Sequence, residues 1–396
     1  MRLLVLTSSY PTPYNPGGGI FIREMLEHLP APIEIVVLTP DIAETATTGI
    51  ERSGLRVERV RYAPKALQIL ANRPGGIPAA LKTFPWLILL LPVWVLAMFT
   101  ATLRLAGKQD LIHAHWSVCG VIGGVAGRLK QIPVVTTLHG TDVDWAERFG
   151  LFRVMLTLCL RLSSRVAAVS TVMTHRLQSR WPRWRNKIQT IPNGVSRAYY
   201  SVPVKDFSTN SDEFVFASVG NLIPGKHVDL TVRAFQRLSQ SGRAARLLIA
   251  GDGPCGPGLR RLVQRHGLNR EIEFLGAIPP DRVARLMQRA HALVLASARE
   301  GRPTIVMEAM AAGVAVIASD IDGVRELIEP GRTGLLFHVG DIEALFAHMA
   351  ALMDQPAKTR QIAQQARHWM TNRNLTWQNT AAQYLQTYQR LAGKGR

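Results

Sequence analysis

Cysteine is scarce in this sequence of 396 residues. Cys119, Cys159 and Cys255 are odd in number and far apart, and no CxxC pair occurs. This pattern excludes a disulfide framework and a structural zinc site, and it suits a reducing compartment. The chain also lacks the composition of a disordered protein, because 47% of its residues are hydrophobic and 19% are charged.

Acidic residues are too few to balance the basic ones. The chain has 47 Lys and Arg against 28 Asp and Glu, a formal net charge of +19. More than half of the excess lies in residues 101–205, which hold 15 basic and 4 acidic residues. This balance predicts an anionic partner, such as nucleic acid, a phospholipid surface or a phosphorylated ligand.

One stretch of this basic region, from Arg176 to Lys187, interleaves arginine with Trp181 and Trp184. Guanidinium pairs with phosphate oxygens, and indole favours the boundary between water and lipid. The stretch is therefore a candidate membrane patch. A solvated helix end and loop would give the same pattern.

No long apolar run opens the chain, so we expect no secretory signal and assign Met1–Thr7 to a buried first strand. A run without charge does occur from Thr83 to Leu103, long enough as a helix to cross a bilayer. Three interpretations stay open for this apolar helix, expected at 84–103. It is a membrane span, a core helix, or a helix packed on its domain with one side at a membrane interface.

Short apolar strands alternate with helical patterns along the whole chain. In the first half the expected strands are Leu3–Thr7, Ile33–Leu38, Leu55–Arg61, Leu111–His115, Pro133–Leu138 and Val166–Val169. In the second half they are Phe214–Val219, Arg246–Ala250, Ile272–Leu275, Ala292–Leu295, Val314–Ala318 and Gly334–Phe337. The alternation predicts an α/β protein of two doubly wound, Rossmann-like domains that face each other across a cleft. We place the domains at 1–205 and 206–375, with a C-terminal helix at 376–396 that packs back on the first domain.

Glycine-rich loops follow several of these strands. Gly17–Gly19 comes between the first strand and a helix, where backbone N–H groups and a helix N-terminus can hold a phosphate. The spacing is not GxGxxG and no acidic residue ends the second strand, so a simple NAD site is poorly supported. A tight turn is the alternative for this loop.

In the second half, three strand-end loops carry glycine and charged residues, at 220–226, 251–254 and 297–304. The carboxyl ends of parallel strands bind ligands, so the three loops can converge on one site. Lys226 can neutralise a diphosphate there. Glu300 and Glu308 lie around a helix N-terminus, whose dipole keeps a carboxylate ionised, although a helix-start preference and a surface glutamate would also explain them.

The combination resembles retaining nucleotide-sugar glycosyltransferases of family 4, which have the GT-B fold. The most specific match is EGRPTIVMEAMAAG (Glu300–Gly313), which looks like the family's E-x7-E motif. Supporting matches are GGGIFIREMLEHL, TTLHGTDVD, IPNGV, GDGP and SDIDGVRELI, so the resemblance covers nearly the whole chain. The opening YPTPYNPGGGIF and the apolar segment are most similar to members that build exopolysaccharide or other bacterial surface glycans on lipid carriers.

The resemblance implies roles for individual residues. Three would be catalytic: Glu300 beside the donor sugar, His139 near the reacting carbon and Lys226 on the diphosphate. Glu308 would bind the ribose hydroxyls. The other donor-binding positions that it implies are Gly18, Gly19, Asn221, Gly251, Gly253, Arg302, Pro303 and Thr304. The family usually has an arginine where Asn221 stands, so stabilisation of the leaving group would rest more on Lys226 or on a substitute such as Arg302.

These assignments predict a retaining hexosyltransferase, peripheral on the cytosolic face of the membrane. Its first domain would hold a lipid-linked or glycan acceptor, and its second a UDP- or GDP-linked sugar. Retention without a clear nucleophile favours attack from the face of the leaving group, and a covalent glutamate intermediate is the alternative. Two other functions stay open: a sugar-nucleotide epimerase or hydrolase of the same form, and a basic nucleic-acid-binding protein, for which no reader motif is present.

A metal requirement has little support in the sequence. Asp142–Asp144 and Asp320–Asp322 match the pattern DxD, which holds a divalent cation in other glycosyltransferases. So short a pattern often arises by chance. Because Lys226 and helix N-termini can supply the same positive potential, we expect no required metal and no cofactor.

Overall fold

The structure is a computed structural model that describes residues 1–13, 15–42, 49–52, 54–71, 75–203 and 213–393. The chain divides into two compact units, residues 1–193 with 377–396 and residues 194–376. The division after Asn193 comes earlier than the boundary expected at 205–206, which lies outside the described residues. Each unit is built on one largely parallel sheet, so the prediction of two Rossmann-like α/β domains is confirmed.

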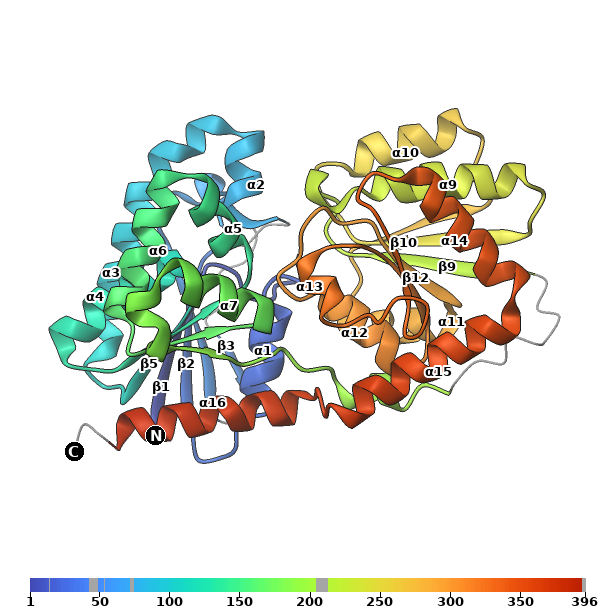
Figure 1. The fold of residues 1–396 in the computed structure, drawn as a ribbon. Helices are drawn as coiled ribbons and strands as arrows, with labels where there is room; N and C mark the ends of the chain where they lie inside the picture. The colour runs from blue at the N-terminus through green and yellow to red at the C-terminus, as the bar shows by residue number, and fades with distance from the viewer. Residues whose placement is uncertain (14, 43–48, 53, 72–74, 204–212, 394–396) are drawn as a thin grey trace. The chain divides into compact units, whose positions relative to one another are not determined.

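The first unit contains an eight-stranded sheet in the order β3-β4-β2-β1-β5-β6-β7-β8. Its central strands β2, β1 and β5 are labelled in Figure 1. Its strands are β1 (Arg2–Leu6), β2 (Glu34–Pro40), β3 (Gly49–Arg52), β4 (Leu55–Val60), β5 (Leu111–His115), β6 (Val134–Leu138), β7 (Arg165–Ala168) and β8 (Ile188–Thr190). Its helices are α1 (Ile20–Glu27), η1 (Lys65–Leu67), α2 (Gly76–Thr83), η2 (Pro85–Leu90), α3 (Leu91–Ala106), α4 (Ser117–Lys130), α5 (Thr141–Arg148), α6 (Gly150–Leu162), α7 (Thr171–Arg180), η3 (Pro182–Lys187) and α16 (Trp377–Ala392). The edge strands β3 and β8 were not expected, because three or four residues carry too little alternation to be recognised.

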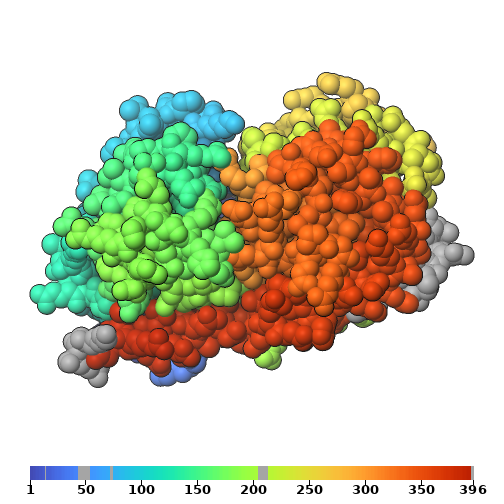
Figure 2. All heavy atoms as spheres, viewed as in Figure 1, coloured from blue at the N-terminus to red at the C-terminus, as the bar shows by residue number. Residues whose placement is uncertain are grey.

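Side chains of β1 alternate between two cores, one on each face of this sheet. Leu3 and Val5 pack with α1 and α16, whereas Leu4 and Leu6 pack with α3 and α4. The C-terminal helix α16 belongs to the first unit and contacts α1 and β5. It forms a continuous band of red atoms on the surface of this unit (Figure 2).

The apolar run forms two helices where the sequence predicted one at 84–103. The 3₁₀ helix η2 ends at Leu90, and α3 begins at Leu91 with Pro92 in its first turn, where proline's missing N–H costs no hydrogen bond. Trp94 and Met98 are buried in the core below, and α3 contacts β2, β4 and α4. One side of α3 therefore belongs to the first unit's core, and the opposite side carries exposed apolar residues.

The second unit contains a six-stranded parallel sheet in the order β11-β10-β9-β12-β13-β14. Its strands are β9 (Phe214–Val219), β10 (Ala245–Ala250), β11 (Ile272–Gly276), β12 (Ala292–Leu295), β13 (Ala315–Ser319) and β14 (Leu335–Phe337). Its helices are α8 (Arg197–Tyr200), η4 (Pro224–Lys226), α9 (Val228–Gln240), α10 (Gly256–Arg265), α11 (Pro280–Arg289), α12 (Thr304–Ala311), α13 (Asp322–Arg325), α14 (Ile342–Asp354) and α15 (Pro356–Asn372). One face of the sheet is covered by α9, α10 and α14, and the other by α11, α12 and α15.

Candidate active site

The loops that follow β9, β10 and β12 interlock at the carboxyl edge of the second unit's sheet. The backbone N–H of Leu222 donates to the Asp252 carbonyl at 2.9 Å, which joins the loops after β9 and β10. The N–H of Ala298 donates to the Gly225 carbonyl at 2.9 Å, which joins the loops after β9 and β12. The predicted convergence of these loops is therefore present within the unit.

Lys226 and Glu300 meet in this group of loops. Lys226 ends η4 after β9, and Glu300 lies between β12 and α12. The Lys226 ammonium donates to Glu300 Oε1 at 2.5 Å, and both side chains are largely buried. Two of the three residues assigned to catalysis thus form an ion pair, although 74 residues separate them in the chain.

Gly323, for which the sequence predicted no role, packs against the loop that contains Glu300. A Cβ atom at this first-turn position of α13 would collide with the carbonyl oxygens of Glu300 and Gly301. Glycine is therefore required for α13 to approach this loop so closely. The motif SDIDGVRELI contained this glycine, but the sequence gave no distance between it and Glu300.

Arg302 is engaged elsewhere in the same unit. Its guanidinium donates to Glu326 Oε2 at 3.1 Å, and its side chain is buried. Burial lowers the pKa of Arg302, although the neighbouring Glu326 acts in the opposite direction. Because this guanidinium already has a carboxylate partner, it is a poor substitute for the cation missing at Asn221.

Pro303, Thr304 and Glu308 belong to the start of α12. Pro303 is the N-cap, Thr304 is the first helical residue and Glu308 follows in the second turn. The neighbours of Glu308, Met307 and Ala309, are fully buried, while Glu308 itself is partly exposed. The helix therefore packs its apolar side chains into the core, and Glu308 stands at a partly exposed position.

The glycines after β10 are required by the way the loops pack. Gly251 has a φ of 143°, and a Cβ atom there would collide with the Gly220 carbonyl. A Cβ atom at Gly253 would come within 2.6 Å of the Leu222 carbonyl oxygen. Asn221 lies between these two contacts, and its carbonyl accepts a hydrogen bond from Ile223 at 2.9 Å. The close contact of the two loops by itself explains why glycine stands at both positions.

The glycine loop of the first unit leads directly into α1. Gly19 is the N-cap of α1 in a left-handed conformation, with a φ of 67°. A Cβ atom at Gly19 would collide with the Ser9 carbonyl, and one at Gly18 would collide with the Asn15 side chain. These contacts hold the loop against Ser9 and Asn15, and no side-chain hydrogen bond caps α1 among the described residues.

His139 follows β6 in the first unit and lies among aromatic rings. Its ring centre is 4.5 Å from that of Phe21 and 4.9 Å from that of Trp116. Its backbone N–H donates to Asp142 Oδ2 at 3.2 Å. Burial lowers the pKa of His139 to about 3, so its imidazole is neutral near pH 7.

A second histidine, His115, stacks on His139. His115 Nδ1 is 3.0 Å from His139 Nε2, and burial also lowers the pKa of His115 well below its usual value. His115 Nε2 is buried without a hydrogen-bond partner among the described residues. If the proton between the two rings were on His139 Nε2, the neutral His115 ring would carry its own proton on Nε2, as a buried N–H without an acceptor. A buried N–H without a partner is rarer than a buried acceptor without one. We therefore assign the shared proton to His115 Nδ1. His139 then carries its own proton on Nδ1 and presents a donor there.

This histidine pair belongs to a buried polar cluster that reaches α16. His113 Nε2 lies 2.7 Å from Thr137 Oγ1, and Tyr384 OH lies 2.8 Å from the same Thr137 oxygen. His113 and His115 were not predicted as site residues, although their alternate positions in β5 place them on one face of the sheet. Their link to Tyr384 was not predictable from the sequence, because it depends on α16 packing back on the first unit.

The two DxD patterns are engaged in contacts within the protein. Asp142 accepts hydrogen bonds from the backbone and hydroxyl of Ser117 at 2.8 and 3.0 Å, and Asp144 pairs with Arg176 at 2.9 Å. Asp320 pairs with Arg325, with Nη2 to Oδ2 at 2.8 Å. Among the residues that the structure describes, no group of three or more His, Cys, Asp or Glu side chains could hold a metal ion.

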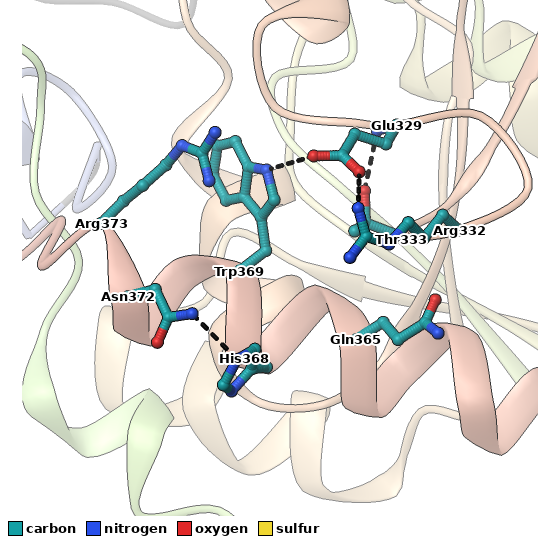
Figure 3. Close-up of a pocket in the computed structure, with 8 residues that line it drawn as sticks. All are labelled: Glu329, Arg332, Thr333, Gln365, His368, Trp369, Asn372 and Arg373. Carbon is teal, nitrogen blue, oxygen red and sulfur yellow. Dashed lines mark hydrogen bonds and ion pairs between the residues drawn. The ribbon is translucent and has the colours of Figure 1, made fainter.

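A small cavity of about 190 Å³ lies beside α15 (Figure 3). Trp369 Nε1 donates to Glu329 Oε1 at 3.1 Å, and the Arg373 guanidinium lies 3.9 Å from the centre of the Trp369 ring. None of the residues assigned to catalysis or donor binding lines this cavity. The cavity therefore shares no lining residue with the candidate active site.

The fold of the two units is similar to that of glycosyltransferases with known structures. Sucrose-phosphate synthase from Thermosynechococcus elongatus matches with a TM-score of 0.79 and 22% identity, covering 100% of each chain. Anabaena HepE in complex with UDP-glucose matches with a TM-score of 0.76 and 21% identity, covering 99% of this chain and 100% of that chain. Two Rossmann-like units of this kind define the GT-B fold.

The sequence then identifies the family. Residues 17–199 match the family model described as Glycosyltransferase Family 4, and residues 204–369 match the model described as Glycosyl transferases group 1. The chain belongs to glycosyltransferase family 4. A putative teichuronic acid biosynthesis glycosyltransferase, TuaC of Bacillus subtilis, is 27% identical over 349 residues, which cover 83% of each chain.

Proposed function

We propose that this enzyme transfers a hexose from a UDP- or GDP-linked sugar to a lipid-linked or glycan acceptor, with retention of anomeric configuration, in the synthesis of a surface polysaccharide. The contact between Lys226 and Glu300 carries the proposal, since it joins a cation and a carboxylate at the carboxyl edge of the sheet. The similarity to a putative teichuronic acid biosynthesis enzyme supports a surface glycan as product. The structural likeness to HepE, which is described in complex with UDP-glucose, supports a nucleotide-sugar donor.

Lys226 would stabilise the leaving group. Cleavage of a sugar–phosphate bond builds negative charge on the nucleotide diphosphate, and a fixed cation lowers the barrier. An ammonium has three N–H donors, so Lys226 can keep its bond to Glu300 while it donates to a phosphate oxygen. Because Arg302 is paired with Glu326 and Asn221 is uncharged, we assign this role to Lys226 and not to an arginine.

Glu300 and Glu308 would act on the donor as hydrogen-bond acceptors. Glu300 holds Lys226 and offers its second oxygen to a sugar hydroxyl, and Glu308 accepts from the ribose hydroxyls. His139, neutral and with its proton on Nδ1, would donate to the sugar and would not act as a general acid at pH 7. The acceptor hydroxyl would lose its proton to the departing phosphate, so no protein base is needed.

We propose further that the enzyme needs no metal and acts as a peripheral protein on the cytosolic face of the membrane. Lys226 and the N-terminus of α12 supply the positive potential that a divalent cation would otherwise provide. We expect transfer to continue at an unchanged rate in EDTA. A loss of activity that Mg²⁺ or Mn²⁺ restores would contradict this part of the proposal.

Product analysis tests the proposed reaction directly. The protein is incubated with UDP-glucose or GDP-mannose and a lipid extract, and products are followed by mass spectrometry. We expect a lipid whose mass has increased by one hexose, with the donor's anomeric configuration retained by NMR. A nucleotide sugar that is only epimerised or hydrolysed would instead support the alternative enzyme of the same fold.

A further inference from the structure

Several large apolar side chains of the first unit point into solvent. Leu151 of α6 is 78% exposed, Leu89 of η2 is 75% exposed, Leu129 of α4 is 64% exposed and Leu96 of α3 is 61% exposed. Exposed leucines that occur singly are normal, so the informative property is whether they share a face.

On each helix these residues recur with helical spacing, so they form stripes. Leu151, Val154 and Leu158 stand at i, i+3 and i+7 on the outer side of α6, whereas Leu156 and Leu160 of the same helix are fully buried. This helix is therefore apolar on its core side and on its solvent side. A helix that served only the core would carry polar residues on the outside.

The helices that carry the stripes are neighbours in one layer. α4 packs against α3 and against α6, and the three lie along one flank of the first unit (Figure 1). The contact is close, because a Cβ atom at Gly120 or Gly124 of α4 would collide with Cys159 or Leu162 of α6. The helix η2, which carries Trp86 and Leu89, contacts α3 and leads directly into it. The stripes thus combine into one surface, which we call the α3–α4–α6 face and which includes the exposed residues of η2.

Charge on this face has a single sign. Residues 83–109, 117–131 and 149–165 contain no Asp or Glu. Basic residues stand at the ends of the stripes, and those that are exposed include Arg104, Lys108, Arg128, Lys130 and Arg161. Glu58 on β4 reaches one of them, Arg104, at 3.4 Å.

We propose that the α3–α4–α6 face docks on an anionic lipid bilayer, with its leucines inserted among the acyl chains and its basic residues at the head groups. Apolar stripes flanked by Lys and Arg are the pattern of proteins that lie on a membrane. A second copy of the chain does not fit this face, because two surfaces of the same sign repel each other. A membrane span does not fit either, because Trp94 and Met98 tie α3 to the core of the unit.

The proposal changes the position of the membrane surface expected from the sequence. In the stretch Arg176–Lys187, Trp181 is buried and donates its indole N–H to Thr157 Oγ1 at 2.9 Å. Arg176 is held by Asp144 and Glu147. Trp181 therefore offers no free indole to an interface and Trp184 is only partly exposed, whereas Trp86 beside Leu89 is half exposed.

This inference deepens the peripheral location proposed above and rests on it. Vesicle flotation tests it, with vesicles of phosphatidylcholine alone or mixed with phosphatidylglycerol. We expect the wild-type chain to float with the anionic vesicles, and the triple variant Leu89→Gln, Leu96→Gln and Leu151→Gln to bind at least tenfold more weakly. The matched control is Val339→Gln, an exposed apolar residue of the second unit, which should bind as wild type.

A charge variant separates electrostatic attraction from insertion. Replacing Lys108, Arg128, Lys130 and Arg161 by glutamine should weaken binding at least tenfold and flatten its dependence on salt. The control replaces Arg261, Arg265, Arg270 and Arg289, four exposed arginines of the second unit, and removes the same net charge. Equal losses in the two quadruple variants would overturn the proposal, since net charge alone would then explain binding.

Insertion itself can be observed at Trp86. Brominated phosphatidylglycerol should quench part of the tryptophan fluorescence of the wild type and less of the variant Trp86→Phe. Binding without this difference, or a triple variant that floats like wild type, would overturn the proposal. So would a wild-type dimer in light scattering that the triple variant abolishes, since a second copy would then cover the face.

UDP-glucose thermal shifts should be unchanged in all these variants, which distinguishes failure at this face from failure of the proposed donor site.

Discussion

The hydroxyl of Tyr388 in α16 lies 2.7 Å from His113 Nδ1 in β5, although 275 residues separate the two in the chain. Both side chains are fully buried, and burial lowers the pKa of His113 to about 3. The C-terminal helix therefore completes the buried polar cluster of His113, His115 and Thr137, which contacts His139. A neutral imidazole at His113 is part of the folded structure of the first unit.

The first prediction concerns acid stability. Unfolded histidine binds a proton near pH 6.5, whereas folded His113 does so only near pH 3. The unfolded chain therefore binds more protons in this window, and the free energy of unfolding falls as the pH falls from about 6.5 towards 3. Replacing His113 by glutamine should reduce that slope by about 1.4 kcal/mol per pH unit, measured by urea unfolding between pH 4 and 7. The variant His175→Gln, at an exposed position, controls for the removal of any histidine, and an unchanged slope in His113→Gln would contradict the assignment.

The second prediction concerns Lys226. Lys226→Met removes the cation beside Glu300 and should lower turnover about 100-fold, because the leaving diphosphate loses its stabilising charge. Steady-state kinetics with a UDP- or GDP-linked sugar measure the effect. Lys358→Met, an exposed position at the start of α15, removes the same charge elsewhere in the unit. Similar turnover in the two variants would show that the phosphate contact is misassigned.

The third prediction concerns Glu308. Glu308→Ala removes the acceptor proposed for the ribose hydroxyls, so donor affinity should fall about tenfold, which corresponds to the loss of a hydrogen bond to a charged group. Calorimetric titration with the nucleotide sugar measures the dissociation constant. The control Glu343→Ala removes an exposed carboxylate from α14, and we expect wild-type affinity from it. Unchanged affinity in Glu308→Ala would rule out the ribose role.

The fourth prediction concerns the contact of α13 with the Glu300 loop. Gly323→Ala places a methyl group against the Glu300 carbonyl, so the loop must shift and the unit should lose about 1–3 kcal/mol of stability. We expect turnover to fall about tenfold as Glu300 is displaced. Gly258→Ala in α10 meets no atom within 4 Å and should leave turnover unchanged. A fully active Gly323→Ala variant would show that the loop tolerates the shift.

Sequence patterns predicted the second unit in detail because its site is local to strand ends. Each loop follows directly from a strand that the apolar pattern identified, and parallel pairing brings the carboxyl ends together. The meeting of Lys226 with Glu300 is a consequence of this rule, since β9 and β12 are neighbours in the sheet. The partner of Arg302 was not predictable, because Glu326 reaches it from the C-cap of α13 and no sequence pattern encodes that approach.

The first unit was harder to predict because its important contacts join distant segments. His113 and His115 stood in a predicted strand, but their partners come from β6, from the residue that follows it and from α16. The apolar run was recognised, yet its two sides could not be told apart, since leucine and tryptophan occur on both. Packing on β2 and β4 selected one side for the core and left the other in solvent.

The amino-acid sequence alone determined the alternation of strands and helices, the glycines that allow loops to touch and the family to which the chain belongs. These properties are encoded in neighbouring residues, through the periods of strand and helix and through the backbone freedom of glycine. Tertiary structure alone decided which charges pair, which histidines stay neutral and which apolar residues remain exposed. Those properties depend on distances and burial, which arise only when segments far apart in the chain are packed together.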